Sequence, residues 1–239
     1  MNADWAASDL RQIPVLLRGE PESINPWIDQ WNTRRVVFYV SVTLVGAGLY
    51  GAAMGWWRAP LQGFYTAIKF PLIILLTTLG NALLNGMLAP LLGVNLRLRQ
   101  SLLAILLSFT MAAAILGAFS PLMFFVVWNL PPLAPGAVIS TTTYSVFQMT
   151  QVGAIAFAGV AANLRLVQLL RHRSGSAAVA RNVLLAWLAG NLFLGSQLCW
   201  ILRPFIGSPN LPLQFLRPNA FQGNFYETVF RTIGYLITS

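Results

Sequence analysis

The sequence is poor in charged side chains, and above all in acidic ones. Only 9% of its 239 residues are charged, and Asp and Glu together number 6. A soluble domain carries roughly 25% charged residues, so this composition predicts a membrane protein. Between Asp29 and Glu227 no acidic residue occurs. Acid–base catalysis, metal-dependent group transfer and cation-coupled transport rely on carboxylates, so we expect no enzyme.

Cysteine and histidine each occur once, as Cys199 and His172. The lone Cys199 excludes an intrachain disulfide, and in its apolar run we expect a small packed side chain. His172 lies among arginines, away from the apolar runs, so no imidazole is expected inside the bundle. We therefore predict no metal site and no cofactor.

Apolar runs are abundant, and five are long enough to cross the hydrocarbon core as helices. They predict an all-α membrane bundle at residues 36–202, between an N-terminal segment, 1–35, and a C-terminal tail, 203–239. The first 35 residues are polar and charged, which is not typical of a cleavable signal. The five spans are expected at 36–57, 70–92, 102–127, 144–162 and 183–202. In an alternative, Pro121 splits the third run into two re-entrant halves.

The basic residues flank the apolar runs and indicate an orientation. No basic stripe is interleaved with aromatics, so we expect no nucleic-acid partner. With five crossings, an excess of cations on one side places the N-terminus in the cytoplasm and the tail outside. One side holds ten cations: Arg11, Arg18, Arg34, Arg35, Arg97, Arg99, Arg165, Arg171, Arg173 and Arg181. The other holds five: Arg58, Lys69, Arg203, Arg217 and Arg231.

Uncharged polar residues remain inside the predicted spans. Amides in hydrocarbon are costly unless hydrogen-bonded, so they should point into the bundle. They either join helices or line a cavity for an uncharged or amphipathic ligand. The candidates are Asn81 and Asn85 in the second span, Gln148 and Gln151 in the fourth, and Asn191 and Gln197 in the fifth.

Small residues form strips that let helix backbones approach closely. Gly51 and Gly55 have GxxxG spacing in the first span, and Gly153 and Gly159 lie in the fourth. Such strips serve contacts within one chain or between copies of the chain.

The tail is rich in proline and aromatic residues, so we expect no continuous helix there but a chain folded against the bundle. A short amphipathic helix is expected at 224–236. Arg203 and Arg217 each follow a leucine and precede a proline. Their guanidinium groups either cap helix carbonyls or clamp a phosphate or carboxylate.

Three segments, GSQLCWILRPF at 195–205, GSP at 207–209 and GNFYE at 223–227, carry a resemblance. They resemble the close of a family of uncharacterised bacterial polytopic membrane proteins. The layout, a polar head before five spans, is also similar to Yip-type membrane proteins. That likeness implies a partner in membrane trafficking rather than an enzyme.

Two functions follow as expectations. The first is a non-enzymatic accessory or scaffold subunit of the bilayer that packs against other membrane proteins or itself. The alternative is a transporter, channel or lipid-handling protein for an uncharged or anionic ligand.

Overall fold

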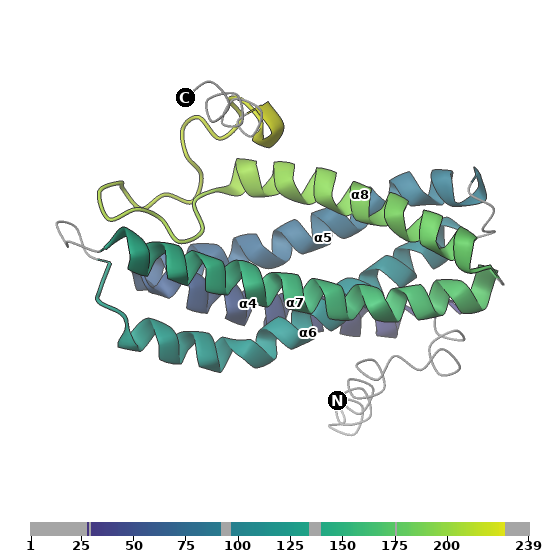
Figure 1. Ribbon diagram of the computed structural model, residues 1–239, viewed down its shortest axis with the longest axis horizontal. Coiled ribbons are helices and arrows are strands. Elements are labelled where there is room, and N and C mark those ends of the chain that lie inside the picture. The colour runs from purple at the N-terminus through teal and green to yellow at the C-terminus, as the bar shows by residue number, and fades with distance from the viewer. Residues whose placement is uncertain (1–27, 29, 92–96, 134–139, 175, 228–239) are drawn as a thin grey trace.

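The computed structural model of the chain describes residues 28, 30–91, 97–133, 140–174 and 176–227. The described residues form five long helices and no strand. All five helices are long and apolar enough to cross a membrane, which confirms the predicted all-α bundle. They are α4 (Thr33–Trp56), α5 (Pro60–Leu91), α6 (Leu98–Asn129), α7 (Thr141–Ser174) and α8 (Ala177–Leu202) (Figure 1).

Local signals explain where the helices begin. The side chain of Asn32 caps α4 by accepting from the backbone N–H of Arg34 at 3.0 Å, and Ser176 caps α8 through Val179 N. The second helix starts at Pro60, ten residues before the expected span, because proline suits the first turn of a helix. Beyond the expected fourth span, α7 continues through a basic segment and ends at Ser174.

Pro121 lies inside α6, and the helix continues past it to Asn129. Proline has no N–H to donate to the carbonyl four residues earlier, which is that of Gly117. The hydroxyl of Ser120 donates to this oxygen at 2.7 Å and compensates for the missing bond. The alternative in which Pro121 divides the third span is therefore wrong.

The first helix, α4, packs closely against both α5 and α6. Gly46 faces α6 so closely that a Cβ there would collide with the carbonyl of Ala113. Gly51 and Gly55 face α5 instead, where an added Cβ would meet the backbone of Thr66 and of Gln62. The GxxxG pair thus serves a contact within one chain.

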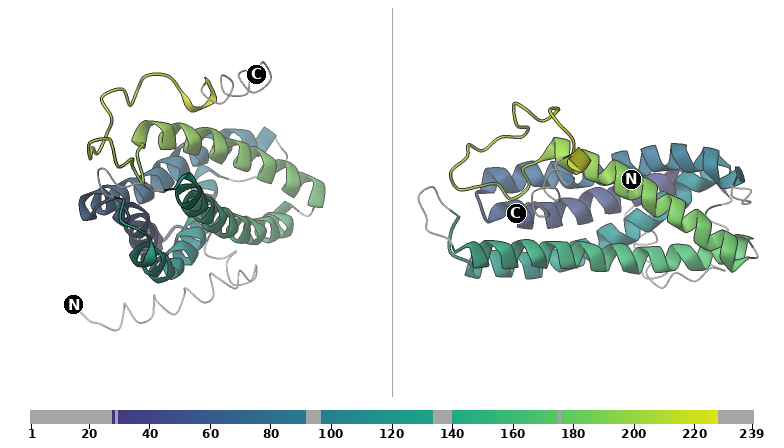
Figure 2. Two further views of the ribbon diagram at one scale, coloured as in Figure 1. Left: turned by 60° about the vertical axis from the view of Figure 1, so that its left-hand side comes forward. Right: turned by 45° about the horizontal axis from the view of Figure 1, so that its top comes forward.

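The last two helices lie at the periphery. α7 packs mainly on α6, and α8 packs mainly on α5. In Figures 1 and 2, α7 and α8 meet where α7 is followed by α8 and diverge toward the opposite end. In the most apolar window of each helix, 61% of α6 is buried but only 22% of α7 and 17% of α8. The hairpin of α7 and α8 therefore packs on the other helices but leaves most of its own surface unburied.

Two predicted features lie outside the described residues. They are most of the N-terminal segment, 1–35, and the part of the expected helix 224–236 beyond residue 227. Residues 225–227 are helical.

Candidate functional site

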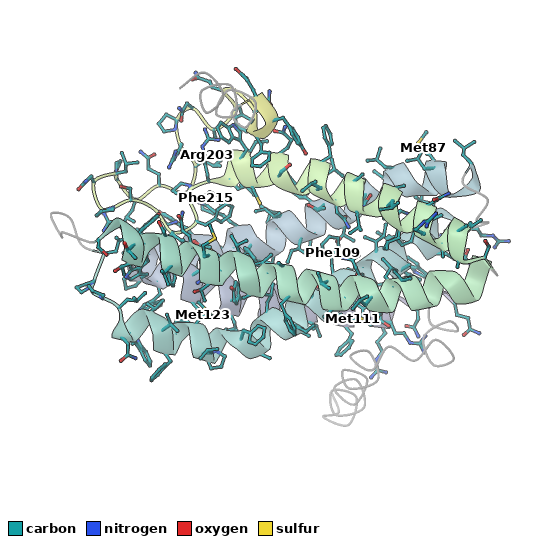
Figure 3. The ribbon with its side chains drawn as sticks, in the orientation of Figure 1. Met87, Phe109, Met111, Met123, Arg203 and Phe215 are labelled. Atoms are coloured by element: carbon teal, nitrogen blue, oxygen red, sulfur yellow. The ribbon has the colours of Figure 1, made fainter. Side chains whose placement is uncertain are left out.

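Residues 203–227, called the tail below, lie across one end of the bundle. Apart from the helical residues 225–227, they form turns, bends and irregular structure. Their backbone carbonyls therefore need donors from elsewhere. Figure 3 shows Arg203 and Phe215 of the tail at this end, which we call the tail end, far from Met87 near the other end of α5.

One face of α5 supplies donors to the start of the tail. Gln62, Thr66 and Lys69 are spaced four and three residues apart, which places them on one face, and each is 0% exposed. Gln62 Nε2 donates to the carbonyls of Pro204, at 3.0 Å, and of Phe205, at 2.8 Å. Thr66 Oγ1 donates to Phe205 O at 2.7 Å, and Lys69 Nζ donates to Pro204 O at 2.9 Å. Each of these two carbonyls thus receives two hydrogen bonds.

The groups in direct contact with the buried ammonium of Lys69 are neutral. The ring centroids of Phe215 and Tyr65 lie 5.1 Å and 6.0 Å from its Nζ. Among the residues that the structure describes, Glu227 is the only acidic side chain, and it is exposed. A carbonyl and two aromatic rings therefore hold this cation where a carboxylate would be usual.

Arg58 connects three parts of the chain at the tail end. Its Nε donates to Ser208 O at 3.1 Å, and its Nη1 donates to Leu133 O at 3.2 Å. Its Nη2 lies 3.2 Å from Pro209 O and 3.5 Å from Leu211 O. The planar guanidinium thus fixes the tail against the segment that follows α6.

Two further donors come from aromatic side chains. The hydroxyl of Tyr144 donates to Gly207 O at 3.1 Å, and the indole of Trp57 donates to Pro131 O at 2.9 Å. Gly207 has a φ of 87°, which glycine adopts without strain. Tyr144 can therefore reach this carbonyl because the chain turns sharply at Gly207.

The two arginines of the tail have different surroundings. The Nη1 of Arg203 donates to Trp200 O at 2.5 Å, and its guanidinium carbon lies 3.6 Å from the Trp200 ring centroid. Arg203 thus caps the last turn of α8. The side chain of Arg217 makes no hydrogen bond or ion pair with any residue of the described part of the chain, although its backbone carbonyl accepts from Ala220 N at 3.0 Å.

A cavity of about 440 Å³ lies between the tail and four helices, and we call it the α7–α8 cavity. Its volume is in the range of small-molecule sites. Its walls are mostly apolar, with a polar part at the tail end. The apolar lining includes Met54, Phe70, Val152, Ile155, Cys199, Phe205 and Ile206, and the polar lining includes Tyr144, Gln148, Gln151, Ser208 and Arg217.

Gln151 is the most unusual residue of this cavity. Its side chain is 4% exposed, yet neither its Oε1 nor its Nε2 has a hydrogen-bond partner. A buried amide without partners costs about 1–3 kcal/mol for each unmet group. Gln148, one turn earlier, is exposed and also lines the cavity. An amphiphilic ligand with hydrogen-bonding groups would satisfy Gln151.

A second cavity of about 340 Å³, the tail cleft, lies on the other side of residues 204–208. Arg58, Gln62, Gln214, Arg217 and Asn219 contribute polar groups to its lining. The Oε1 of Gln62 is buried and has no hydrogen-bond partner. Since Gln62 Nε2 donates to two carbonyls, its Oε1 is the atom left to accept.

Comparison with protein families, with curated proteins and with solved structures finds no match to this chain. The site must therefore be interpreted from its own geometry. Among the described residues, no group of three His, Cys, Asp or Glu side chains comes together. Amides, hydroxyls and cations remain as binding groups.

The other predicted amides line neither cavity in the described part of the chain. Asn81 is fully buried, and its Nδ2 donates to Trp187 O at 3.0 Å and to Asn191 Oδ1 at 2.5 Å. These two asparagines join α5 to α8. Asn85 lies in α5, but its side chain is outside the described part, and Gln197 is partly buried in α8 without lining either cavity. The structure thus separates the amides of α5 and α8 from those of α7.

The predicted small residues of α4 and of α7 also have different surroundings. A Cβ built on Gly153 or Gly159 of α7 meets nothing within 4 Å, in contrast to the tightly packed Gly51 and Gly55. Cys199 was expected to be packed, but it is exposed on α8 and lines the α7–α8 cavity. That expectation was wrong because α8 is mostly unburied.

Sequence reasoning missed Gln62 and Thr66, because it placed them before the second span. Two signals could have revealed them. Pro60 is a typical first residue of a helix, and Gln62, Thr66 and Lys69 recur with the spacing of one helix face. Arg58 was counted only as a flanking cation, and no pattern in the sequence indicates its carbonyl partners.

Proposed function

We propose that the protein is a non-catalytic, lipid-handling membrane protein that holds an amphiphile in the α7–α8 cavity. The observation that carries the proposal is the buried, unpartnered amide of Gln151 in a cavity with an apolar wall. A purely structural amide in hydrocarbon would be bonded to a neighbouring helix, as Asn81 is. The splayed α7–α8 hairpin supports access from the bilayer.

The proposal leaves out catalysis on chemical grounds. No Asp or Glu occurs between Asp29 and Glu227, and the only histidine is His172. His172 lies 21 residues after Gln151 in the same helix, or about 30 Å along its axis. The cavity lining therefore offers binding groups and no carboxylate or imidazole.

Cys199, the single cysteine, lines the cavity and serves as the probe for a test. The protein is purified in a non-ionic detergent and treated with a water-soluble methanethiosulfonate reagent, with and without added phospholipid. We expect phospholipid to slow the modification of Cys199, because a bound amphiphile covers the thiol.

A matched control separates binding in the cavity from general coverage by lipid. In a Cys199→Ser background, Val160→Cys places a thiol on the exposed surface of α7, outside both cavities. Phospholipid should slow the modification of Cys199 more than the modification of this control thiol. Equal slowing at both positions would refute a lipid site in the cavity.

The proposed orientation keeps the N-terminus in the cytoplasm of a bacterial inner membrane and the tail outside, as the ten-to-five distribution of cations favours. The same thiol tests it. A membrane-impermeant reagent added to intact spheroplasts should modify Cys199. Modification only after lysis would reverse the assignment.

A second candidate function is an accessory or scaffold subunit, favoured by one specific observation. Gly153 is exposed on α7 and nothing lies within 4 Å of a Cβ built on it, as expected for a small residue in a face that receives another helix. Such a subunit should migrate in native form as part of a larger complex after mild solubilisation. If the protein instead migrates as a monomer and lipid still slows the modification of Cys199, the result favours the lipid-handling function.

A further inference from the structure

The tail end gathers positive charge without acidic partners. Arg58, Lys69, Arg203 and Arg217 all lie there, and the only acidic side chain in the described part of the chain, Glu227, lines neither cavity. Three of the four cations are used by the protein itself. Arg58 and Lys69 bind carbonyls, and Arg203 caps α8.

Arg217 is the cation whose hydrogen-bonding capacity is not used by the described residues. Its side chain is half-buried and belongs to the lining of both cavities. Burial and, after it, the positive charge of Arg217 lower the pKa of Arg203 below its ordinary value. A bound anion would relieve this repulsion between like charges and would use the fork of donors that a guanidinium offers.

Two buried side chains with unpartnered polar atoms line the cavities and indicate what accompanies the anion. Gln62 Oε1, in the tail cleft, can only accept a hydrogen bond, so it requires a donor. The Gln151 amide, in the α7–α8 cavity, can donate and accept. Hydroxyl groups satisfy both, and a bare carboxylate or phosphate does not.

We propose that the amphiphile is anionic, a phosphate ester with hydroxyl groups, and that Arg217 binds its phosphate while the apolar wall of the α7–α8 cavity holds its chain. This inference rests on the proposed function and adds the chemical class of the ligand. Arg217 is the residue that determines specificity, because its position joins the linings of the two cavities.

The test uses the full-length protein in a non-ionic detergent and follows the protection of Cys199. Phosphatidylglycerol has the proposed headgroup, phosphatidylcholine has a phosphate without net charge or hydroxyls, and glycerol phosphate has the headgroup without chains. One charge-assisted contact corresponds to a preference of roughly tenfold or more. We expect half-protection by phosphatidylglycerol at about one tenth of the phosphatidylcholine concentration.

Each outcome bears on one of the two proposals. Equal protection by the two phospholipids overturns the anion inference but keeps the proposed function. No protection by either overturns the proposed function. Protection by glycerol phosphate alone, at the same concentration as phosphatidylglycerol, supports anion recognition but assigns the site to a soluble phosphate ester.

Substitution identifies the residue. In Arg217→Gln, the concentrations of the two phospholipids that give half-protection of Cys199 should lie within about threefold of each other. Arg181→Gln, an exposed arginine at the start of α8 and remote from the tail end, should retain the preference. A preference unchanged in Arg217→Gln would refute the role of Arg217.

A measurement on the unsubstituted protein covers the case in which Arg217→Gln does not fold. Raising the ionic strength from about 0.05 M to about 0.5 M should reduce the preference for phosphatidylglycerol, because Arg217 is only half-buried, so that salt screens its exposed part and the anions of the salt compete for its guanidinium. A preference that does not respond to salt contradicts recognition by charge.

Discussion

The contacts of Arg58 make the strongest prediction about stability. The substitution is Arg58→Met, which keeps much of the aliphatic stem and removes every donor. Three hydrogen bonds of 3.1–3.2 Å and one of 3.5 Å are lost, to carbonyls on both sides of the tail end. A hydrogen bond from a charged group contributes about 1.5–3 kcal/mol when buried, and partial exposure reduces this to about 1 kcal/mol.

The free energy of unfolding should therefore fall by about 3 kcal/mol in Arg58→Met. Arg58→Lys should recover only part of this loss, because one ammonium cannot reach carbonyls in two separate segments. Equilibrium unfolding in mixed micelles, followed by tryptophan fluorescence, measures the change. Limited proteolysis between residues 208 and 215 should accelerate in parallel, since the tail loses its attachment.

Arg181→Met is the matched control, because Arg181 is exposed at the opposite end and should change the stability by less than about 0.5 kcal/mol. If Arg58→Met were as mild as this control, the hydrogen bonds to the tail carbonyls would not stabilise the tail end. The same conclusion would follow if the tail stayed resistant to protease.

Five further substitutions test the packing and the buried polar contacts. Gly46→Ala should destabilise the protein by about 2 kcal/mol or more, because its Cβ meets a backbone carbonyl of α6. Gly159→Ala, with open space at its Cβ, should stabilise α7 by up to about 1 kcal/mol, and equal effects of the two would refute the close contact. Asn81→Ala and Asn191→Ala should show a coupling energy of about 0.5–1.5 kcal/mol in a double-mutant cycle, and additivity would contradict their hydrogen bond. Lys69→Met should leave the free energy of unfolding unchanged or raise it by up to about 2 kcal/mol, because a buried cation without a carboxylate is removed while its stem is kept. A loss above about 1 kcal/mol would show that the bond to Pro204 O outweighs this cost.

The helical class and the five apolar helices could be predicted from the sequence, because hydrocarbon imposes length and composition on whatever crosses it. The start of α5 could not be placed by hydropathy. The first ten residues of α5 include Gln62, Thr66 and Lys69, whose polar groups donate hydrogen bonds to carbonyls of the tail. Polar side chains bonded to a distant segment look like a loop when only neighbouring residues are considered.

The candidate site shows the same limit. Arg203 and Arg217 stand in identical Leu-Arg-Pro contexts, yet Arg203 caps a helix and Arg217 faces two cavities. Gln151 and Asn81 are both amides of apolar helices, yet only Gln151 lacks partners. The difference between the two amides depends on how α7 and α8 diverge, and the difference between the two arginines depends on the course of the tail. No local pattern in the sequence encodes either.

The attachment of the tail has a consequence for how its sequence can change. The bundle donates from side chains, and the tail accepts almost entirely with backbone oxygens, from Pro204 to Leu211. Arg58 and Gln62 therefore recognise the course of the main chain and are indifferent to the side chains that it carries. Homologues could replace many tail residues and still dock in the same way, provided that the turn at Gly207 is kept. The side chains that line the two cavities could then change while the tail keeps its position.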